Sequence, residues 1–461
     1  MRPATISLSL ALVFLASGAH ILGQNSQRIQ GAIEPRAELR TRTVEVLRGG
    51  SIDVSADGTR ELRVEVFVYE EITRELAAKS DTDIDETSFS WQLPDGKYYV
   101  ILRNVSDAAG SYVVRVSPQG RELNDGTRPS FAVMKIFYAT DRVALRGEAA
   151  TQVTFGTEPG DQLQFGICRV SIPRAHRMGE LEGPSILRLD FREDPGKHIA
   201  IIGIEPERIS SFLRDVSAHV RRFKKREAFV FVHGFNTDFQ TAARRTAQLA
   251  YDLGFEGAAI MYSWPSQGRV GLVSYNKDSR NAQLSTPRFT EFLAKLASET
   301  GVSSIYVVAH SMGARVVTGA LASQVKEHSA SHVRQIALIA PEIDAGEFRS
   351  VAAELKQSAE HVTLYASSKD GALRASEVLQ GYPRAGEGEP NLLVIPGIDT
   401  VDASAVDTSL LALSHSYFAD NRSILSDLFY LIRGNPPNER ACLKARHRSD
   451  GMYWAFMPAI H

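Results

Sequence analysis

The sequence has little cysteine, almost no net charge and no internal apolar stretch long enough to cross a bilayer. Only two of its 461 residues are cysteine, Cys168 and Cys442, which excludes a disulfide framework but leaves one possible pair open. The formal net charge is −2, from 52 basic and 54 acidic residues, so no global field attracts nucleic acid. No Cys-x-x-Cys or paired-histidine spacing indicates zinc, and we expect neither a metal nor another cofactor.

The N-terminus has the pattern of a secretory signal peptide. Arg2 supplies a positive charge, residues 6–16 are mostly apolar, and Ser17-Gly18-Ala19 provides small residues at the cleavage position. The apolar run is shorter than the roughly 20 residues that a transmembrane helix needs. We therefore expect residues 1–19 to be a signal peptide of a secreted, periplasmic or cell-envelope protein without firm membrane insertion. An uncleaved membrane anchor is the alternative.

The length of the chain favours two or three domains, and the first of them reads as all-β. Short runs of alternating apolar and polar residues, separated by turn signals, are typical of an antiparallel sandwich. Residues 94–116, PDGKYYVILRNVSDAAGSYVVRV, resemble the last hairpin of bacterial pre-peptidase C-terminal β-sandwich domains. We predict a polar linker at 20–40, a β-sandwich accessory domain at 41–118 that binds a surface or another protein, and a second linker at 119–130.

Beyond the second linker, buried strands alternate with helical patterns, which predicts a mostly parallel sheet with helices on both faces. This α/β-hydrolase domain is expected at 131–435, followed by a C-terminal tail at 436–461. In such sheets, ligands bind beyond the carboxyl ends of the strands. The expected strands are 229–233, 258–264, 305–310, 336–340, 362–367 and 392–395, and the expected helices are 241–253, 287–298, 315–326 and 347–359.

A candidate nucleophile lies where one such strand meets a helix. Val307-Val308-Ala309-His310-Ser311-Met312-Gly313 runs from an apolar strand through a turn of small residues. A nucleophile elbow requires this context, because the serine occupies a sharp turn that needs small neighbours two residues before and two after it. Ala309 and Gly313 hold those positions, so Ser311 is the predicted nucleophile. We interpret His310 as a packed structural histidine.

The same reaction needs backbone N–H donors for the negative charge on the tetrahedral intermediate. One donor is expected from Met312, directly after the nucleophile, and the other from the loop after an earlier strand. That strand ends in His233-Gly234-Phe235-Asn236, where Gly234 permits an unusual backbone and Phe235 offers its N–H. We expect His233, Gly234, Asn236 and Gly313 to support the site without reacting.

The acid and the base of the triad are expected after Ser311, in the order aspartate or glutamate and then histidine. His415 follows the last expected strand and is the best base among the twelve histidines. Asp370 follows the penultimate strand and is the preferred acid, with Asp344 as the alternative. Weaker options after the last strand are Asp402 and Asp407.

Together these segments resemble an uncharacterised bacterial α/β-hydrolase family from about residue 135 to residue 418. The resemblance implies the fold and an esterase- or lipase-like serine hydrolase activity, but it supplies no substrate. Glu342 stands where members often carry aspartate, which again favours Asp370 as the acid. The motifs that carry the resemblance are Tyr138-Ala139-Thr140-Asp141-Arg142, Phe165-Gly166, Val170-Ser171-Ile172-Pro173, His176 with Gly179, His233-Gly234-Phe235-Asn236, Ser263-Trp264-Pro265-Ser266, Ala309-His310-Ser311-Met312-Gly313 and Ser414-His415-Ser416-Tyr417.

The sequence thus predicts a serine hydrolase that cleaves an ester or related acyl bond through an acyl-enzyme on Ser311. The expected partner is a small-molecule or lipid-like acyl substrate, with no role for nucleic acid. An acyltransferase or an amidase would use the same triad, and a catalytically silent binding protein would keep the fold without the reaction. These alternatives share the same predicted site residues, because the choice of leaving group and acceptor depends on the shape of the pocket.

Overall fold

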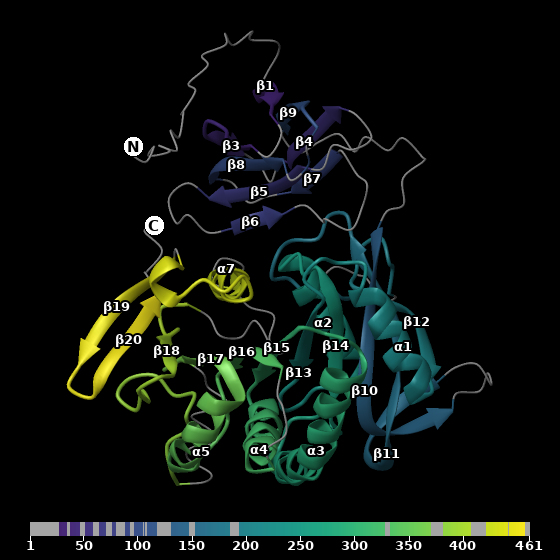
Figure 1. The fold of residues 1–461 in the computed structure, drawn as a ribbon, viewed down its shortest axis with the longest axis vertical. Helices are drawn as coiled ribbons and strands as arrows, with labels where there is room; N and C mark the ends of the chain where they lie inside the picture. The colour runs from purple at the N-terminus through teal and green to yellow at the C-terminus, as the bar shows by residue number, and fades with distance from the viewer. Residues whose placement is uncertain are drawn as a thin grey trace, which may run out of the picture.

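The computed structural model describes an all-β N-terminal region and a large α/β region (Figure 1). The predicted signal peptide, Asp370, Asp407 and His415 lie outside the described residues. The described residues are 27–34, 37–46, 51–58, 64–70, 76–79, 88–92, 96–104, 106, 108–117, 131–146, 153–184, 193–327, 332–369, 381–406, 421–440 and 442–456.

The N-terminal region consists of two antiparallel sheets, which include residues 27–33 and 38–40 from the segment expected to be a linker. One has the order β1-β9-β4-β7; the other has the order β2-β8-β5-β6, and β3 also pairs with β8. Alternate side chains of β4, β5 and β9, such as Val54, Val68 and Val114, are buried between the sheets, as the period-two pattern predicts. The strands are β1 Gln27–Ile33, β2 Glu38–Arg40, β3 Val44–Val46, β4 Ser51–Gly58, β5 Val64–Glu70, β6 Leu76–Lys79, β7 Ser88–Gln92, β8 Gly96–Asn104 and β9 Gly110–Ser117.

The second region is built on one large sheet with the order β12-β11-β10-β14-β13-β15-β16-β17-β18-β20-β19. Strands β10, β14, β13, β15, β16, β17, β18 and β20 run parallel, and antiparallel strands lie at the two edges. The strands are β10 Phe131–Arg146, β11 Val153–Pro173, β12 Ala200–Glu207, β13 Glu227–Val232, β14 Gly257–Ser263, β15 Ser304–His310, β16 Val333–Ile339, β17 Ala359–Ala366, β18 Asp399–Asp402, β19 Leu443–Arg448 and β20 Gly451–Phe456.

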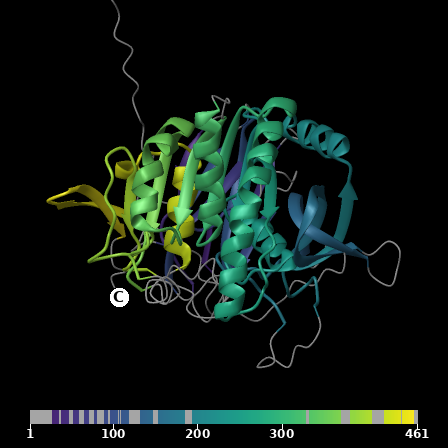
Figure 2. The same ribbon diagram turned by 90° about the horizontal axis from the view of Figure 1, so that it is seen from below.

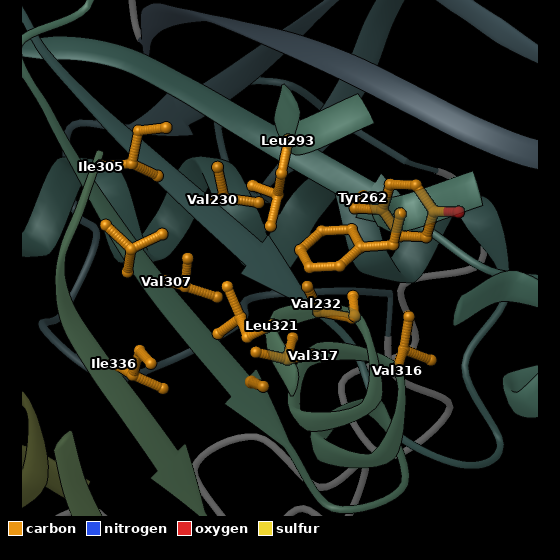
Figure 3. Packing of buried hydrophobic residues seen from close by; sticks show 14 of the residues in the cluster. Val230, Val232, Tyr262, Leu293, Ile305, Val307, Val316, Val317, Leu321 and Ile336 are labelled. Carbon is orange, nitrogen blue, oxygen red and sulfur yellow. The ribbon is translucent and has the colours of Figure 1, made fainter. Parts of the chain in front are cut away.

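Helices cover both faces of this sheet, as expected for an α/β-hydrolase fold (Figure 2). One apolar core lies under α1, α3, α4 and α5, where Val230, Val307 and Leu321 pack together (Figure 3). The other lies under α2 and α7. Because both faces are covered, β13 and β14 are buried along their whole length. The helices are α1 Ile209–Val220, α2 Phe239–Asp252, α3 Leu272–Glu299, α4 Gly313–Lys326, α5 Ala345–Ser358 and α7 Asn421–Leu431, with a short 3-10 helix at Pro437–Glu439.

The sandwich lies against the α2 and α7 face of the large sheet. Tyr99 of β8 is part of the apolar core on that face, and β6 contacts α7. Figure 1 shows the sandwich above both helices. The guanidinium of Arg40 lies 3.7 Å from the centroid of the Tyr99 ring, a cation–π distance. The sandwich is therefore packed on the face of the sheet opposite to α3 and α4.

Three features of the α/β region differ from the sequence-based expectation. Residues 392–395 are not a strand; the strand that follows β17 along the chain is β18. Residues 443–456, expected in a tail, form β19 and β20 and extend the sheet. Helix α3 begins at Leu272, well before Pro287, which lies inside it. The apolar run at 392–395 is nevertheless buried, because Leu392 and Leu393 cover the core.

Cys168 and Cys442 are both buried, and no disulfide joins them. Among the described helices, none has both the length and the apolar character needed to cross a bilayer.

Candidate active site

Ser311 occupies a sharp turn between β15 and α4. Strand β15 ends at His310, the φ angle of Ser311 is +48°, and α4 begins at Gly313. This left-handed conformation costs a non-glycine residue about 1–3 kcal/mol, so surrounding contacts must hold it. Ser311 N–H donates to Ile339 O at 3.0 Å, and Ser311 O accepts from Glu342 N–H at 3.2 Å. The strand, strained turn and helix that an elbow requires are therefore present.

The turn is packed too tightly for larger neighbours. A Cβ on Gly313 would lie 2.3 Å from His233 O and 2.8 Å from Val232 O, both backbone atoms. Ala309 is completely buried. Because backbone cannot move aside as a flexible side chain can, a side chain at position 313 would separate α4 from the loop after β13. Ser311 itself remains half-buried.

The loop after β13 touches the nucleophile turn at Gly234. A Cβ on Gly234 would lie 2.9 Å from the Cβ of Ser311 and 2.8 Å from His310 Nδ1. Asn236, two residues later, has a φ of +56°, which turns the chain away. The backbone of the 234–236 loop therefore passes directly beside Ser311, where an oxyanion donor is needed.

The direction of the Phe235 N–H follows from its neighbouring carbonyl. His233 Nδ1 lies 2.9 Å from Gly234 O, so this ring nitrogen carries the hydrogen and donates it. In a trans peptide the C=O and the next N–H point in opposite directions. The N–H of Phe235 therefore points away from the His233 ring. Within the described part of the chain, neither Phe235 N–H nor Met312 N–H donates to a partner, and Met312 lies at the N-terminus of α4.

His233 is a neutral brace of this loop. Its Nε2 lies 3.1 Å from Ser263 Oγ, and its ring is stacked on Trp264, whose indole N–H donates to His233 O at 2.7 Å. Burial, with the charge of Arg142 adding to it, lowers the pKa of His233 to about 3. An imidazole that stays neutral and has both nitrogens engaged positions the loop and is not free to exchange protons with substrate.

Arg142, at the end of the Tyr138–Arg142 motif, ties the loops of the site together. It is 1% exposed, and its guanidinium donates to Thr237 O at 2.8 Å and to Ser266 O at 2.9 Å. It also donates to Ser263 Oγ at 2.9 Å, which fixes the hydroxyl beside His233. Burial lowers the pKa of Arg142 to about 10, so it remains charged at neutral pH. Sequence reasoning placed this residue in a motif but gave it no role.

Asp278 of α3 also holds these loops through its carboxylate. Its carboxylate accepts from Ser266 Oγ at 2.6 Å and from the backbone N–H groups of Gln267 at 2.8 Å and Asn236 at 3.5 Å. Burial raises the pKa of Asp278, while these hydrogen bonds oppose the shift. Sequence reasoning missed it, because a single aspartate in a helix carries no local signal.

Glu342 lies beside the elbow, but its carboxylate is already committed. It forms ion pairs with Arg315 Nη2 at 2.7 Å and with Arg384 Nε at 3.5 Å. The hydroxyl of Tyr275 also donates to it. A carboxylate shared between two guanidinium groups and a phenol is poorly suited to orient a catalytic histidine. The structure thus gives Glu342 a supporting position next to Ser311.

The alternative acids are also engaged in local structure. Asp344 caps α5, where its Oδ1 accepts from Glu347 N–H at 2.8 Å. Asp402, the last residue of β18, accepts from Ser404 N–H at 2.9 Å. Asp370 follows β17 and His415 follows β18, and these strands pair in parallel. The carboxyl ends of both strands therefore lie on the same side of the sheet as Ser311, which follows the carboxyl end of β15.

The other histidines near the parallel strands lie far from Ser311 or are buried beside it. His332 precedes β16 and His361 lies near the start of β17, at the opposite edge of the sheet from Ser311. His310 is buried with no hydrogen-bond partner for Nδ1 among the described residues. Burial, together with the nearby charge of Arg245, lowers the pKa of His310 to about 3. A neutral, packed role fits these facts.

Residues 209–433 match the model of a family described as "Alpha/beta hydrolase of unknown function (DUF900)". The α/β fold of this part of the chain agrees with that description. The match begins at α1 and runs through α7, so it spans the elbow, the 234–236 loop and the positions of Asp370 and His415. A search of curated proteins finds no matching sequence.

Solved structures give weaker likenesses. A "putative cell surface hydrolase" of Lactobacillus plantarum is 16% identical, covers 47% of this chain and 96% of its own, and has a TM-score of 0.29. A family two carbohydrate esterase of Cellvibrio japonicus is 9% identical over 72% of this chain and 98% of its own, with a TM-score of 0.17. A periplasmic inhibitor of g-type lysozyme from Aeromonas hydrophila is 16% identical over 20% of this chain and 86% of its own, with a TM-score of 0.16. At these TM-scores the likenesses carry no functional argument.

Proposed function

We propose that the protein is a serine hydrolase that cleaves an ester or related acyl bond through an acyl-enzyme on Ser311. The observation that supports this most strongly is the backbone of Ser311, which is held at a φ of +48° between β15 and α4. A residue in that conformation is strained, and such strain is concentrated at functional sites. A capping serine at an ordinary helix start has no need of it.

In the proposed mechanism, Ser311 Oγ attacks the substrate carbonyl while His415 accepts the hydroxyl proton. The new Oγ–C bond gives a tetrahedral intermediate whose oxyanion accepts hydrogen bonds from the N–H groups of Phe235 and Met312. When the ester C–O bond breaks, His415 returns the proton to the leaving alcohol. Asp370 orients the imidazole and stabilises its charged form. Water then repeats the sequence on the acyl-enzyme and releases the acid.

The surroundings of Phe235 and Met312 support their proposed role as oxyanion donors. The Gly234 carbonyl is held by His233, which leaves the Phe235 N–H directed away from the ring and available to an oxyanion. Each such donor is worth about 2.7–4 kcal/mol in the transition state. The N-terminus of α4 adds a favourable dipole at Met312. We also propose that residues 1–19 direct the protein to the cell envelope or the medium.

The test is hydrolysis of short-chain p-nitrophenyl esters by the full chain and by Ser311→Ala. The proposal predicts that kcat falls by about 10⁴ or more in the variant while the unfolding transition is unchanged. Ser303→Ala, in an exposed turn, is the matched control and should keep wild-type kcat. Equal turnover by Ser311→Ala, or no turnover by wild type on esters, amides and acyl acceptors, would overturn it.

A further inference from the structure

The most exposed large apolar side chains among the described residues lie together at the start of α3. Val270 is 78% exposed, Leu272 55% and Val273 83%. We call these three residues the apolar tip. They surround Gly271, whose φ is +127°, and an added Cβ there would have nothing within 4 Å. The tip therefore projects into open space and does not line a cavity.

The apolar tip is connected to the candidate active site through Tyr275. Tyr275 N–H donates to Gly271 O at 2.9 Å in the first turn of α3. Its ring lies 5.8 Å, centroid to centroid, from the ring of Phe235, whose N–H is the proposed oxyanion donor. Its hydroxyl donates to Glu342, which in turn donates its N–H to Ser311 O. The tip is thus next to the side of the site formed by the 234–236 loop.

The exposed face of α3 continues the tip with cationic and apolar residues. Residues that are three, four or seven apart share a helix face, so Lys277, Arg280 and Leu284 follow Val273 along one stripe. Arg280 is exposed and Leu284 is 49% exposed. Arg269, just before the tip, is also exposed. Of these cations, only Lys277 forms an ion pair among the described residues, with the exposed Glu158.

We propose that the apolar tip and the neighbouring cations Arg269, Lys277 and Arg280 bind an anionic phospholipid surface. The Ser311 site then lies next to that surface. Apolar side chains combined with Lys and Arg on one helix face are typical of segments that lie in the membrane interface. The apolar groups enter the headgroup boundary, and the cations bind lipid phosphates. This mode is adsorption and needs no membrane-spanning helix.

Charge and size argue against a second copy of the chain as the occupant. A two-fold contact through the tip would bring the exposed cations Arg269 and Arg280 of both copies into one small interface. A stable interface also buries about 20–30 residues a side, far more than the tip and its stripe supply. An anionic lipid surface extends beyond the tip and is opposite in charge to the arginines. It can therefore bind the apolar tip and the cations together without repulsion.

The consequence for the substrate rests on the proposed function. If Ser311 attacks an acyl ester, adsorption through α3 brings the site to esters that are presented at a lipid surface. The substrate class is then an ester with at least one chain anchored in the lipid layer. Binding to the surface, in contrast, does not depend on the reaction.

The first experiment measures flotation of the full chain with vesicles of phosphatidylcholine, with and without phosphatidylglycerol. We expect binding only when phosphatidylglycerol is present, and weakening as salt is raised. Val270→Ser, Leu272→Ser and Val273→Ser combined should lower the partition coefficient at least about tenfold, which is about 1.4 kcal/mol. Arg269→Gln with Arg280→Gln should remove the preference for anionic vesicles.

The controls separate the surface from folding and from catalysis. Val133→Ser with Met452→Ser removes two other exposed apolar side chains, each 49% exposed, and should leave binding unchanged. Ser311→Ala should bind like wild type. The triple serine variant should hydrolyse a water-soluble short ester normally but lose activity on an ester embedded in the vesicles. Because all three side chains are exposed, we expect its circular dichroism spectrum to match wild type.

Absence of wild-type binding to anionic vesicles, equal binding to both compositions, or undiminished binding of the triple variant would each overturn the inference. Its failure is distinct from that of the proposed function. Vesicle binding without any hydrolysis would support the lipid-binding surface and overturn the proposed hydrolase activity. Hydrolysis of soluble esters without vesicle binding would support the proposed hydrolase activity and overturn the lipid-binding surface.

Discussion

Gly234 and Ser311 are in such close contact that a Cβ on Gly234 would lie 2.9 Å from the Cβ of Ser311. We therefore predict that Gly234→Ala displaces either the elbow or the 234–236 loop. Because an oxyanion donor works only when it is within hydrogen-bond reach of the developing charge, kcat for ester hydrolysis should fall by about 10² or more. Gly183→Ala is the control, since its Cβ would have no neighbour nearer than 4.0 Å, and it should keep full activity. Similar activities for the two variants would contradict the close-contact account.

The hydrogen bond from His233 to Gly234 O gives a second prediction. His233→Ala removes the donor that fixes the 234–235 peptide, so the Phe235 N–H loses its fixed direction. We expect kcat to fall by about 10²–10³ with little change in KM, because the lost interaction strengthens only in the transition state. The pH dependence of the remaining activity should be unchanged, since burial keeps His233 neutral with a pKa of about 3. His332→Ala, at an exposed histidine, is the control; a shifted pH profile in His233→Ala would indicate a proton-transfer role instead.

The buried guanidinium of Arg142 gives a prediction about stability. Arg142→Met keeps the length of the side chain but leaves the carbonyls of Thr237, Ser266 and Gly156 without their donor. Breaking such a buried network should lower the free energy of unfolding by about 3–5 kcal/mol, measured by urea titration. For comparison, Arg169→Met disrupts an exposed ion pair with Glu205 and should cost at most about 1 kcal/mol. Equal effects of the two changes would rule out a central structural role for Arg142.

His176 provides a prediction about pH. Its Nδ1 lies 2.8 Å from a Glu182 carboxylate oxygen and its Nε2 lies 2.8 Å from Asp252 Oδ1. Burial alone would lower the pKa of this imidazole, but the two carboxylates together raise it to about 10. A raised pKa in the folded state means that the charged histidine contributes its full stability below the unfolded pKa of about 6.5. That contribution is lost as pH rises from about 6.5 through about 10.

The variant His176→Gln tests this directly. At pH 6 its free energy of unfolding should be about 3–5 kcal/mol below that of wild type, because two buried carboxylates lose their cationic partner. The difference should narrow steadily as pH approaches 10. Urea unfolding at pH 6, 8 and 9.5 measures it, and a difference that stays constant across this range would show that His176 is not charged in the folded protein.

The parts of the site that the sequence predicts are those encoded over a few neighbouring residues. The elbow is readable because an apolar strand, small residues and a helix follow one another around Ser311. The 234–236 loop can be predicted because a buried strand ends in His-Gly. The assignment of Asp370 and His415 as acid and base stays a prediction, since both lie outside the described residues.

The parts that escaped sequence reasoning depend on distant partners. Arg142 donates to carbonyls 95 and 124 residues away, and Asp278 accepts from Asn236, 42 residues before it. Nothing in the residues next to Arg142 or Asp278 encodes those contacts. The run at 392–395 misled for another reason, because apolar character indicates burial but does not specify a strand. Leu393 is buried, yet its carbonyl accepts from Thr400 Oγ1 at 2.8 Å in an irregular segment.

The polar sequence of residues 443–456 predicts a tail, but these residues form hairpin β19–β20. Lys444, Arg446 and Arg448 lie on an edge hairpin with exposed surface, where polar residues are compatible with a strand. Only its pairing with β18, which lies more than 40 residues earlier, identifies it as part of the sheet.

The account depends most on Ser311 being an activated nucleophile. The most direct measurement is labelling of the full chain with a fluorophosphonate probe, followed by mass spectrometry of its peptides. We predict one label per molecule, on Ser311, with labelling abolished in Ser311→Ala and strongly slowed in Gly234→Ala. Absence of labelling in the folded wild-type protein, or a label on a different residue, would contradict the account.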